Sequence, residues 1–550
     1  MDVVLTSTPD VATHPVEPAR RDRTRLWLAA VVLLALAVRL VALRHGLPHA
    51  YSADEELHFV PQAARAADGD WYSGYFENPS GLTYLLAVVF LLVLPGEDLT
   101  RLLVDDPAVV FTVARLVVAL LGTATVVVVA VAGRRAFGPR EGVWAAALLG
   151  LSFLPVFYAH HALNDAVTLL PLTVALVACL RLHERGDVGS AVVAGAAVGV
   201  ATGVKYLAAP MALVIGLALL LRVLQRRQRL LPAVGLLAAA AVACVACLVA
   251  LNPFIVLEAA KFWGDFSGQS AQAATTKLGQ TGAAWSGYPV TLLWGLGAVP
   301  TVLAVLGLVL AWRRDRAVAV LLVAFPVLLY AAMATQDRWF ARWLLPAYPS
   351  LVVLAGHGVV RLTGVLRERL PGRTRPVIAV LVPAVVLAQP VTDVVRSDVV
   401  LSREDTRAEA LAWLTSGATD GRRIVVEPAV PGSYRRALRD AGFELRPVER
   451  PFQAYEQRLG PSLIDDYRAD GWCWVMVNGH QRDRGLAAGL PGAIAYYRRL
   501  DEESTTAFAA SPYAAGATPP DFSYDFSFNY YPPAHHRPGP VVEIHRLDGC

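Results

Sequence analysis

Acidic residues beside apolar segments are the strongest candidates for chemistry in this chain. Asp54 and Glu55 follow the first apolar segment, Glu77 lies further along the same polar stretch, and Asp165 ends a polar gap between two later apolar segments. Carboxylates next to a membrane are costly to desolvate, so they are functional candidates. A carboxylate within hydrogen-bond reach can take the proton of an attacking hydroxyl group. If these acids lie on one side of a bilayer, they could share a site.

A histidine adds a second possibility to the first polar stretch. His58 lies four residues after Asp54, so both would face one side of a helix. Asp54, His58 and Glu77 could therefore ligate a divalent metal ion, since imidazole and carboxylate groups are common metal ligands. The alternative is that His58 is an ordinary residue of the membrane interface.

The composition predicts an integral membrane protein. Of the 550 residues, 55% are hydrophobic and 17% are charged, whereas soluble proteins carry about 25% charged residues. Apolar runs of roughly 17–25 residues, the length that crosses a bilayer, recur along the chain. The net charge of +4 is small. Membrane lipids are expected partners, and nucleic acid is not.

We expect a polytopic α-helical protein with about eleven transmembrane helices. The stretch 82–94 is apolar but short, and runs of its length are often interfacial or re-entrant. The expected spans lie near residues 26–43, 108–132, 142–159, 166–181, 188–204, 206–221, 230–251, 287–311, 317–335, 343–360 and 377–391.

The positions of the arginines predict the orientation in the membrane. If 82–94 does not cross and the N-terminus is cytoplasmic, every arginine cluster between spans faces inward, as the positive-inside bias requires. The candidate acids then share the outer face with three cations, Lys205, Arg338 and Arg342. We therefore expect a multi-pass protein of the cytoplasmic membrane, with its N-terminus inside and its C-terminal portion outside. The inward clusters lie near 20–25, 134–140, 181–185, 222–229, 313–316 and 361–375.

Changes in composition divide the chain into three parts. Residues 1–25 lack periodicity and predict a disordered cytoplasmic tail, and 26–391 form the transmembrane domain. Residues 392–550 are polar, and their alternating helix and strand patterns predict a small extracytoplasmic α/β domain. Two of its cysteines, Cys473 and Cys550, could pair, but spacing alone does not show it.

One aromatic segment of this outer domain has two interpretations. Tyr513–Tyr531 is rich in aromatic residues, Pro and Asp. It could cover the membrane domain as a lid. The interpretation that we favour is that it covers the core of the small domain.

The order of these motifs resembles the GT-C superfamily of membrane glycosyltransferases. The resemblance is to the lipid-carrier-dependent branch, which includes protein O-mannosyltransferases and the aminoarabinose transferases of lipid A. Asn78 departs from the lipid A branch, where this position is often basic. The matching elements are Asp54-Glu55, Phe76-Glu77-Asn78-Pro79, Ala114-Arg115-Leu116, Asp165, the Gly-rich span ending in Lys205-Tyr206, and Arg338 before Leu345-Pro346.

The resemblance implies an enzyme that transfers a hexosyl or pentosyl group outside the cytoplasmic membrane. The donor would be a polyprenyl-phosphate sugar, and the acceptor a hydroxyl group on a lipid, glycan or protein. Asp54 would act as the base, and Glu55, Glu77 and Asp165 would be further catalytic acids. Lys205, Arg338 and Arg342 would bind the phosphate of the donor. A divalent metal ion is a possible cofactor.

Other roles are open for these residues and for the protein. Asp54 could be a solvated loop acid or a helix N-cap, and Asp165 could cap the following span. The three cations could be anchors at the membrane interface. The alternative functions are a membrane transporter, and a non-catalytic membrane scaffold with an outer binding domain.

Overall fold

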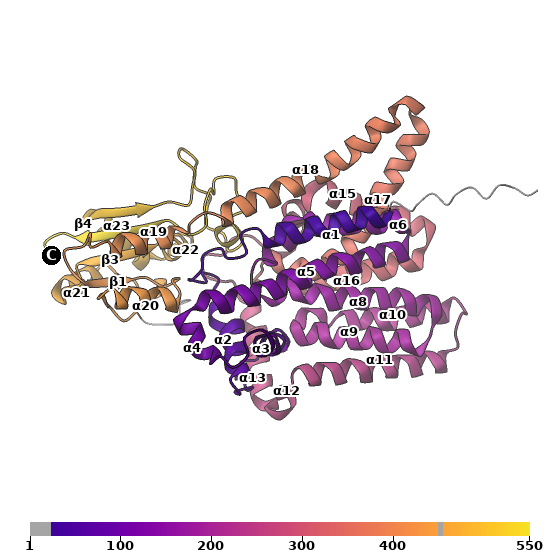
Figure 1. The fold of residues 1–550 in the computed structure, drawn as a ribbon, viewed down its shortest axis with the longest axis horizontal. Helices are drawn as coiled ribbons and strands as arrows, with labels where there is room; N and C mark the ends of the chain where they lie inside the picture. The colour runs from indigo at the N-terminus through magenta and orange to yellow at the C-terminus, as the bar shows by residue number, and fades with distance from the viewer. Residues whose placement is uncertain (1–23, 449–454) are drawn as a thin grey trace, which may run out of the picture.

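The protein consists of a bundle of long helices and a smaller domain built on a β-sheet. The computed structural model describes residues 24–448 and 455–550. In Figure 1 the long helices run side by side along the long axis of the molecule, and the sheet lies beyond one end of them. The predicted tail, residues 1–25, lies outside the described residues except for its last two positions.

Each predicted span coincides with a helix or with consecutive helices. Eight helical stretches of the described chain are long and apolar enough to cross a membrane, and two shorter helices, α3 and α9, are also apolar. The polytopic helical fold is confirmed, and the number of eleven crossings stays a prediction. The helices of the bundle are α1 (Thr24–Leu40), α5 (Pro107–Ala136), α6 (Pro139–Leu151), α7 (Phe153–Tyr158), α8 (Asn164–Arg185), α9 (Val188–Val204), α10 (Met211–Leu224), α11 (Leu230–Leu251), α14 (Ala284–Leu292), η3 (Leu293–Gly297), α15 (Ala298–Arg314), α16 (Arg316–Ala334), η4 (Ala341–Ala347), α17 (Tyr348–Arg369) and α18 (Arg375–Leu401).

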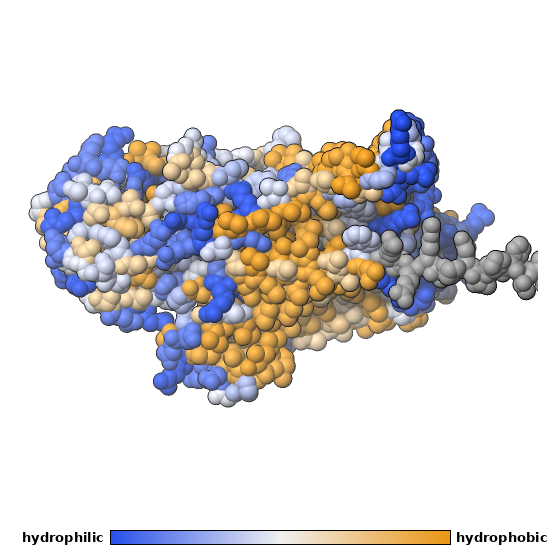
Figure 2. Space-filling model, turned by 45° about the horizontal axis from the view of Figure 1, so that its top comes forward, coloured by the Kyte–Doolittle hydropathy of each residue, from blue (hydrophilic) through white to orange (hydrophobic). Residues whose placement is uncertain are grey.

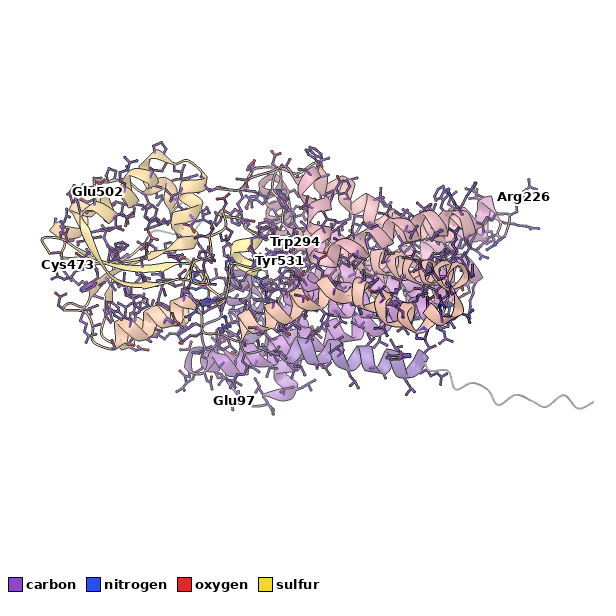
Figure 3. The ribbon with its side chains drawn as sticks, turned by 90° about the horizontal axis from the view of Figure 1, so that it is seen from above. Glu97, Arg226, Trp294, Cys473, Glu502 and Tyr531 are labelled. Atoms are coloured by element: carbon purple, nitrogen blue, oxygen red, sulfur yellow. A yellow bond between two sulfur atoms is a disulfide. The ribbon has the colours of Figure 1, made fainter. Side chains whose placement is uncertain are left out.

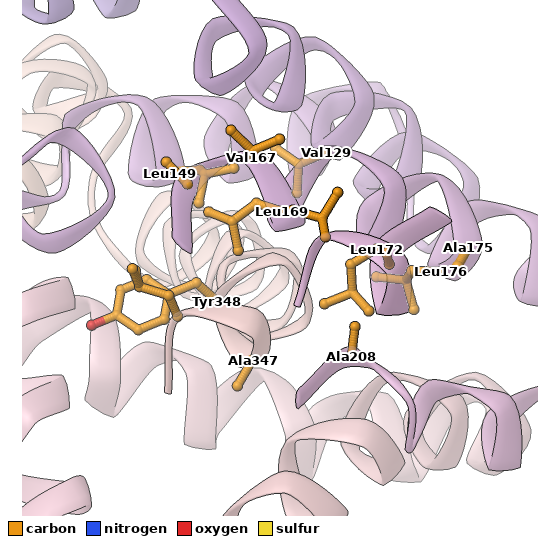
Figure 4. Close-up of a cluster of buried hydrophobic side chains, with 14 of the residues drawn as sticks. Val129, Leu149, Val167, Leu169, Leu172, Ala175, Leu176, Ala208, Ala347 and Tyr348 are labelled. Atoms are coloured by element: carbon orange, nitrogen blue, oxygen red, sulfur yellow. The ribbon is translucent and has the colours of Figure 1, made fainter. Parts of the chain in front are cut away.

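Small and branched residues let these helices pack closely. A side chain at Gly195 or Gly199 of α9 would overlap the backbone of α11, and one at Gly307 of α15 would overlap that of α17. Close approach through small residues is a common way for helices to associate in a membrane. Figure 4 shows part of the apolar core, where leucines of α8 pack with side chains from α5, α6 and α17.

Short helices gather at the end of the bundle that faces the sheet domain (Figure 1). The apolar stretch predicted not to cross forms α3, a helix of 13 residues, which is too short to span the hydrocarbon. These short elements are η1 (Glu55–Phe59), α2 (Val60–Ala67), α3 (Gly81–Val93), α4 (Leu99–Asp105), η2 (Tyr206–Ala208), α12 (Phe254–Leu257) and α13 (Ala259–Ala273). Glu55 begins the first of them, directly after Asp54, and Glu77 lies between α2 and α3.

The C-terminal domain has the predicted mixture of helices and strands. Its five-stranded sheet has the order β2-β1-β3-β5-β4, parallel at β2, β1 and β3 and antiparallel beyond β3. Cys473 and Cys550 form a disulfide. Helix α18 runs through the predicted boundary at 391. The elements are η5 (Gly372–Thr374), which precedes α18, then α19 (Thr406–Thr415), β1 (Arg423–Val426), α20 (Gly432–Asp440), β2 (Glu444–Leu445), η7 (Glu456–Arg458), α21 (Leu463–Ala469), β3 (Trp474–Asn478), α22 (Gly479–Ala487), α23 (Pro491–Glu502), β4 (Ser504–Ala510), α24 (Phe526–Asn529) and β5 (Val542–Leu547).

The surface changes in polarity along the long axis. On the face seen in Figure 2, hydrophobic residues cover much of the helical bundle, and most of the hydrophilic residues lie on the C-terminal domain and at the opposite end. Arg226 and Cys473 lie at opposite ends of the molecule (Figure 3). This distribution fits a multi-pass membrane protein whose two polar ends lie on different sides of the bilayer.

The favoured interpretation of the aromatic segment 513–531 is wrong. We call residues 522–532 the strap. Its Phe526 and Tyr531 pack against Trp294 of the bundle, with ring centroids 5.3 Å and 5.1 Å from that side chain, and Figure 3 shows Trp294 and Tyr531 together where the two domains meet. Phe526 and Tyr531 therefore pack against the membrane domain, whereas Phe528 stacks on His480 of the C-terminal domain.

Candidate active site

A cavity of about 160 Å³ lies between the helical bundle and the C-terminal domain. The membrane domain supplies charged groups to its wall, including Asp54, Lys277 and Arg342. The C-terminal domain supplies mainly aromatic and heteroaromatic rings, with a buried ion pair behind them. The residues of the C-terminal wall are Asp405, Arg407, His480, Tyr524, Phe528, Tyr530 and Pro538.

Four of the predicted residues form one chain of charges at this cavity. Arg342 donates a hydrogen bond of 3.0 Å from Nη2 to Oδ2 of Asp54, and its Nε lies 3.9 Å from Oδ2 of Asp165. The other carboxylate oxygen of Asp165 is paired with the ammonium group of Lys205. Residues from four separate segments therefore converge, as predicted from the shared outer face.

Neither acid of this chain of charges, Asp54 or Asp165, caps a helix. Asp54 precedes η1 and Asp165 lies in the first turn of α8, yet neither helix start has a side-chain cap. Asp54 keeps 43% of its side chain exposed, and its Oδ1 has no hydrogen-bond partner among the described residues. Asp165 is 3% exposed. The first acid can therefore meet a ligand, and the second holds cations in place.

Glu55 has a different environment from its neighbour Asp54. Arg115 of α5 donates to both carboxylate oxygens of Glu55, at 2.7 Å and 2.9 Å, and the backbone N–H of Ala162 donates at 2.9 Å. Burial raises the pKa of Glu55, but the Arg115 guanidinium outweighs it, so the pKa lies below its ordinary value. Glu55 is 0% exposed and does not line the cavity, so this predicted catalytic acid is placed to fix the loop instead.

Glu77 lies at the edge of this group rather than inside it. Its carboxylate has no hydrogen bond or ion pair with another described residue. Both Glu77 and Asp54 act on Tyr75, whose pKa is raised chiefly by burial and further by these two carboxylates. Asn78, the residue after Glu77, donates to the Tyr75 hydroxyl at 2.9 Å and accepts from Asn164 at 3.1 Å. Glu77 therefore borders the site and has a free carboxylate.

Arg338 and Arg342 do not share a helix face. The segment between them is irregular, and η4 begins only at Ala341. Arg338 turns toward α13, where its Nη1 donates to Gln272 at 3.3 Å. Of the three predicted phosphate-binding cations, Arg342 lines the cavity, Lys205 is paired behind it, and Arg338 lies at its side.

The residues proposed for a metal ion do not converge. His58 stacks on Tyr75, with ring centroids 4.5 Å apart, and Asp54 is engaged by Arg342. Within the described residues, no group of three or more His, Cys, Asp or Glu side chains is arranged to hold a metal ion. The donor set of Asp54, His58 and Glu77 therefore does not fit a divalent ion in this arrangement.

Lys277 is a cavity residue that the sequence reasoning did not select. It lies in the loop between α13 and α14, with its Nζ 4.4 Å from the ring centroid of Tyr524 and 5.2 Å from that of Phe340. Burial, together with the charge of Arg342, lowers the pKa of Lys277 to about 7. The only sequence signal was a lysine in an otherwise uncharged outer loop.

The strap holds the turn that carries Arg342. Asp525 is 6% exposed, and both of its carboxylate oxygens accept from the backbone N–H of Ala341 at 3.1 Å. Tyr524 donates to the carbonyl of Leu278 at 2.7 Å, next to Lys277. Burial raises the pKa of Asp525 to about 6. The C-terminal domain thus positions both of the cations that the membrane domain supplies to the cavity, Lys277 and Arg342.

Comparisons with known proteins agree with this architecture. The model of a family described as dolichyl-phosphate-mannose-protein mannosyltransferase matches residues 107–251. No curated protein sequence matches the chain.

Two solved structures share most of the fold. ArnT from Cupriavidus metallidurans, bound to undecaprenyl phosphate, has a TM-score of 0.52 at 16% identity, covering 95% of this chain and 98% of that one. The archaeal oligosaccharyltransferase AglB from Archaeoglobus fulgidus, in complex with an inhibitory peptide and a dolichol-phosphate, has a TM-score of 0.54 at 11% identity, covering 89% and 74%. Identities this low show the fold alone.

The fold and the family match define a class. The chain has the fold of the GT-C superfamily of membrane glycosyltransferases, so the resemblance seen in its motifs is confirmed. It is a multi-pass helical membrane protein with a small C-terminal α/β domain. These findings support an enzyme of the glycosyltransferase class.

Proposed function

We propose that this protein transfers a sugar from a polyprenyl-phosphate donor to an acceptor hydroxyl group at the outer face of the cytoplasmic membrane. The observation that carries the proposal is the chain Asp54–Arg342–Asp165–Lys205 at a cavity beside the membrane domain. A carboxylate and a cation facing one small cavity are what proton removal and phosphate departure require.

The reaction breaks one bond and forms one. The acceptor oxygen attacks the anomeric carbon of the donor sugar, and the bond from that carbon to the phosphate oxygen breaks. The electron pair leaves with the polyprenyl phosphate, and the hydroxyl proton passes to Asp54. Asp54 is suited to this role because Arg342 occupies only one of its two oxygens. Such assistance typically accelerates a reaction about 10²- to 10⁴-fold.

Arg342 and Lys277 would stabilise the leaving phosphate. Both line the cavity, and fixed cations in a site with little water stabilise developing negative charge. Asp165 and Lys205 would hold Arg342 in place. The anionic phosphate would also favour the protonated form of Lys277, whose pKa of about 7 allows it to gain charge as the donor binds.

Glu55 and Glu77 would then have supporting roles. Glu55 fixes the start of η1 through Arg115 and so orients Asp54. Glu77, with its free carboxylate beside Tyr75, would orient the acceptor. The transporter alternative has less support, because the charged residues inside the first spans, Arg39 and Arg115, are buried and bonded to backbone or carboxylate oxygens.

The proposed orientation puts the cavity and the C-terminal domain outside the cell. Arginine clusters occupy the opposite end of the bundle, as the positive-inside bias favours. The Cys473–Cys550 disulfide supports an oxidising compartment for the C-terminal domain. Labelling of an engineered surface cysteine in intact cells tests this orientation: modification at position 226 but not at 502 by a membrane-impermeant maleimide contradicts it.

A donor panel tests the function. Vesicles containing the purified protein are incubated with radiolabelled polyprenyl-phosphate mannose, glucose, arabinose and aminoarabinose, with vesicles carrying Asp54→Asn as the control. We expect one donor to lose its label to membrane or cell-wall acceptors only with the wild-type protein. Equal turnover in both vesicle types contradicts the proposal. Adding a chelator to the same assay tests whether transfer requires a divalent metal ion. Transfer that stops with the chelator and returns with added Mg²⁺ or Mn²⁺ supports that requirement.

A further inference from the structure

Two polar groups at the cavity have no hydrogen-bond partners. His480, at the start of α22, is 4% exposed and lines the cavity. Its Nε2 is 3.1 Å from the carbonyl of Ser527, which makes Nε2 the donor, and its Nδ1 has no hydrogen-bond partner. Tyr51 also lines the cavity, and its buried hydroxyl group likewise has no hydrogen-bond partner.

Buried polar atoms without partners are costly, so a ligand that bonds to these two groups at the cavity would be stabilised there. Burial, together with the nearby charge of Arg407, lowers the pKa of His480 to about 3. The imidazole is therefore neutral at physiological pH, and Nδ1 presents a lone pair. A lone pair at this position accepts a hydrogen bond from a hydroxyl group. The Tyr51 hydroxyl can donate or accept.

Aromatic rings surround these two polar groups. The His480 ring stacks on Phe528, with centroids 4.2 Å apart, and the guanidinium of Arg407 lies 3.9 Å from the centroid of Tyr51. Tyr524 and Tyr530 complete the wall. Flat rings with a few fixed polar groups suit a ligand that has both C–H faces and hydroxyl groups.

The size of the cavity suits a small ligand. Its volume is about 160 Å³, which is enough for one sugar ring.

We propose that Tyr51 and His480 form a subsite for a single carbohydrate ring, in which a sugar hydroxyl donates to Nδ1 of His480. This subsite rests on the proposed function and deepens it, because it makes the C-terminal domain part of sugar recognition. The ring belongs either to the donor or to the acceptor. No bond of the sugar changes at His480, which binds and orients it.

Two conservative variants and one matched control test the subsite. Tyr51→Phe removes only the hydroxyl group. His480→Gln keeps a donor near Ser527 and removes the acceptor at Nδ1. The control is His535→Gln, since His535 is 3% exposed and its Nδ1 also lacks a partner, but it does not line the cavity.

Binding is measured first, without any turnover. Free mannose, glucose, galactose and arabinose are offered to the protein in lipid nanodiscs, and contact is detected by saturation-transfer NMR. We expect at least one sugar to bind, with the signal reduced at least fivefold in Tyr51→Phe and His480→Gln and unchanged in His535→Gln. Equal signals in all four proteins overturn the subsite, as does an absence of binding by every sugar when the KM values below are also unchanged.

Kinetics then identify the source of the ring. Release of labelled sugar to water without acceptor gives the KM of the donor, and transfer gives that of the acceptor. We expect a rise of at least tenfold in one of them for His480→Gln, about the cost of one lost hydrogen bond. Sugar binding that depends on His480 in a protein without transferase activity would leave the subsite standing and reject the proposed function. Transfer that depends on Asp54 with both KM values unchanged rejects the subsite alone.

Discussion

Two neighbouring carboxylates, Asp54 and Glu55, each pair with an arginine, but in different surroundings. Glu55 receives two hydrogen bonds from Arg115, and their side chains are 0% and 1% exposed. Asp54 receives one from Arg342, and these side chains are 43% and 25% exposed. The first pair closes a gap between two segments of the bundle. The second leaves an oxygen open to the cavity.

The comparison separates stability from chemistry. A fully buried pair with every oxygen bonded has no capacity left for a ligand, and losing one partner leaves an unpaired buried charge. A half-exposed pair adds little stability, but it holds a carboxylate and a guanidinium side by side where a substrate can reach both. One chain segment therefore carries both kinds of acid at adjacent positions.

The largest effect is expected from Asp54→Asn. This change keeps the shape of the side chain and removes its basicity, so we expect transfer to fall by about 10²- to 10⁴-fold with the melting temperature nearly unchanged. Turnover of labelled donor by purified protein gives the rate, and thermal unfolding gives the stability. A folded variant with wild-type turnover would end the assignment of Asp54 as the base.

Arg115→Met is expected to act in the opposite way. It leaves Glu55 buried and unpaired, which typically costs roughly 3–5 kcal/mol. We expect a much lower melting temperature and little folded protein. The matched control is Arg101→Met, because the Arg101–Asp105 pair is 77% and 60% exposed and such pairs are worth at most about 1 kcal/mol. Similar melting temperatures for the two variants would contradict the contrast.

Asp525→Ala tests whether the strap positions the Asp54–Arg342 pair at the cavity. Without the carboxylate, the N–H of Ala341 loses its partner and the turn carrying Arg342 shifts. A displacement of about 1 Å in a catalytic group can cost about 10²-fold in rate, so we expect a kcat reduction of that order. Asp525→Asn keeps an oxygen acceptor and should restore most of the rate. Equal losses in both variants would mean that the contact with Ala341 does not position Arg342.

The smallest expected effect is a pH dependence from Lys277. Its pKa of about 7 means that the free enzyme loses this positive charge as the pH rises through 7. We expect kcat/KM for the donor to fall by about tenfold per pH unit above 7 if that charge is required. Lys277→Arg stays charged at every pH used, so its profile should be flat there. The same decline in the arginine variant would assign the titration to another group.

The sequence predicted well whatever depends on local pattern. Apolar runs located the helices, and the arginine distribution placed Asp54, Asp165, Lys205 and Arg342 on one face, where they do meet. The alternating helix and strand patterns of residues 392–550 predicted the mixed composition of the C-terminal domain.

What the sequence could not predict are contacts between distant segments. Asp525 lies 184 positions from Ala341, and nothing in either local pattern links them. His58 shares a helix turn with Asp54, yet its ring stacks on that of Tyr75. The aromatic strap was assigned to the wrong core, because a hydrophobic pattern shows that a side chain needs burial without showing which surface provides it.

Helix α18 runs unbroken from the arginine-rich end of the bundle to the C-terminal domain. Its 27 residues, with Pro383 and Pro390 in its interior, extend over about 40 Å, and its Arg396 donates to backbone carbonyls of the strap. One helix thus connects the membrane domain to the segment that holds the turn of Arg342. If a thicker or thinner bilayer changes the tilt of this helix, we expect the strap to move with it.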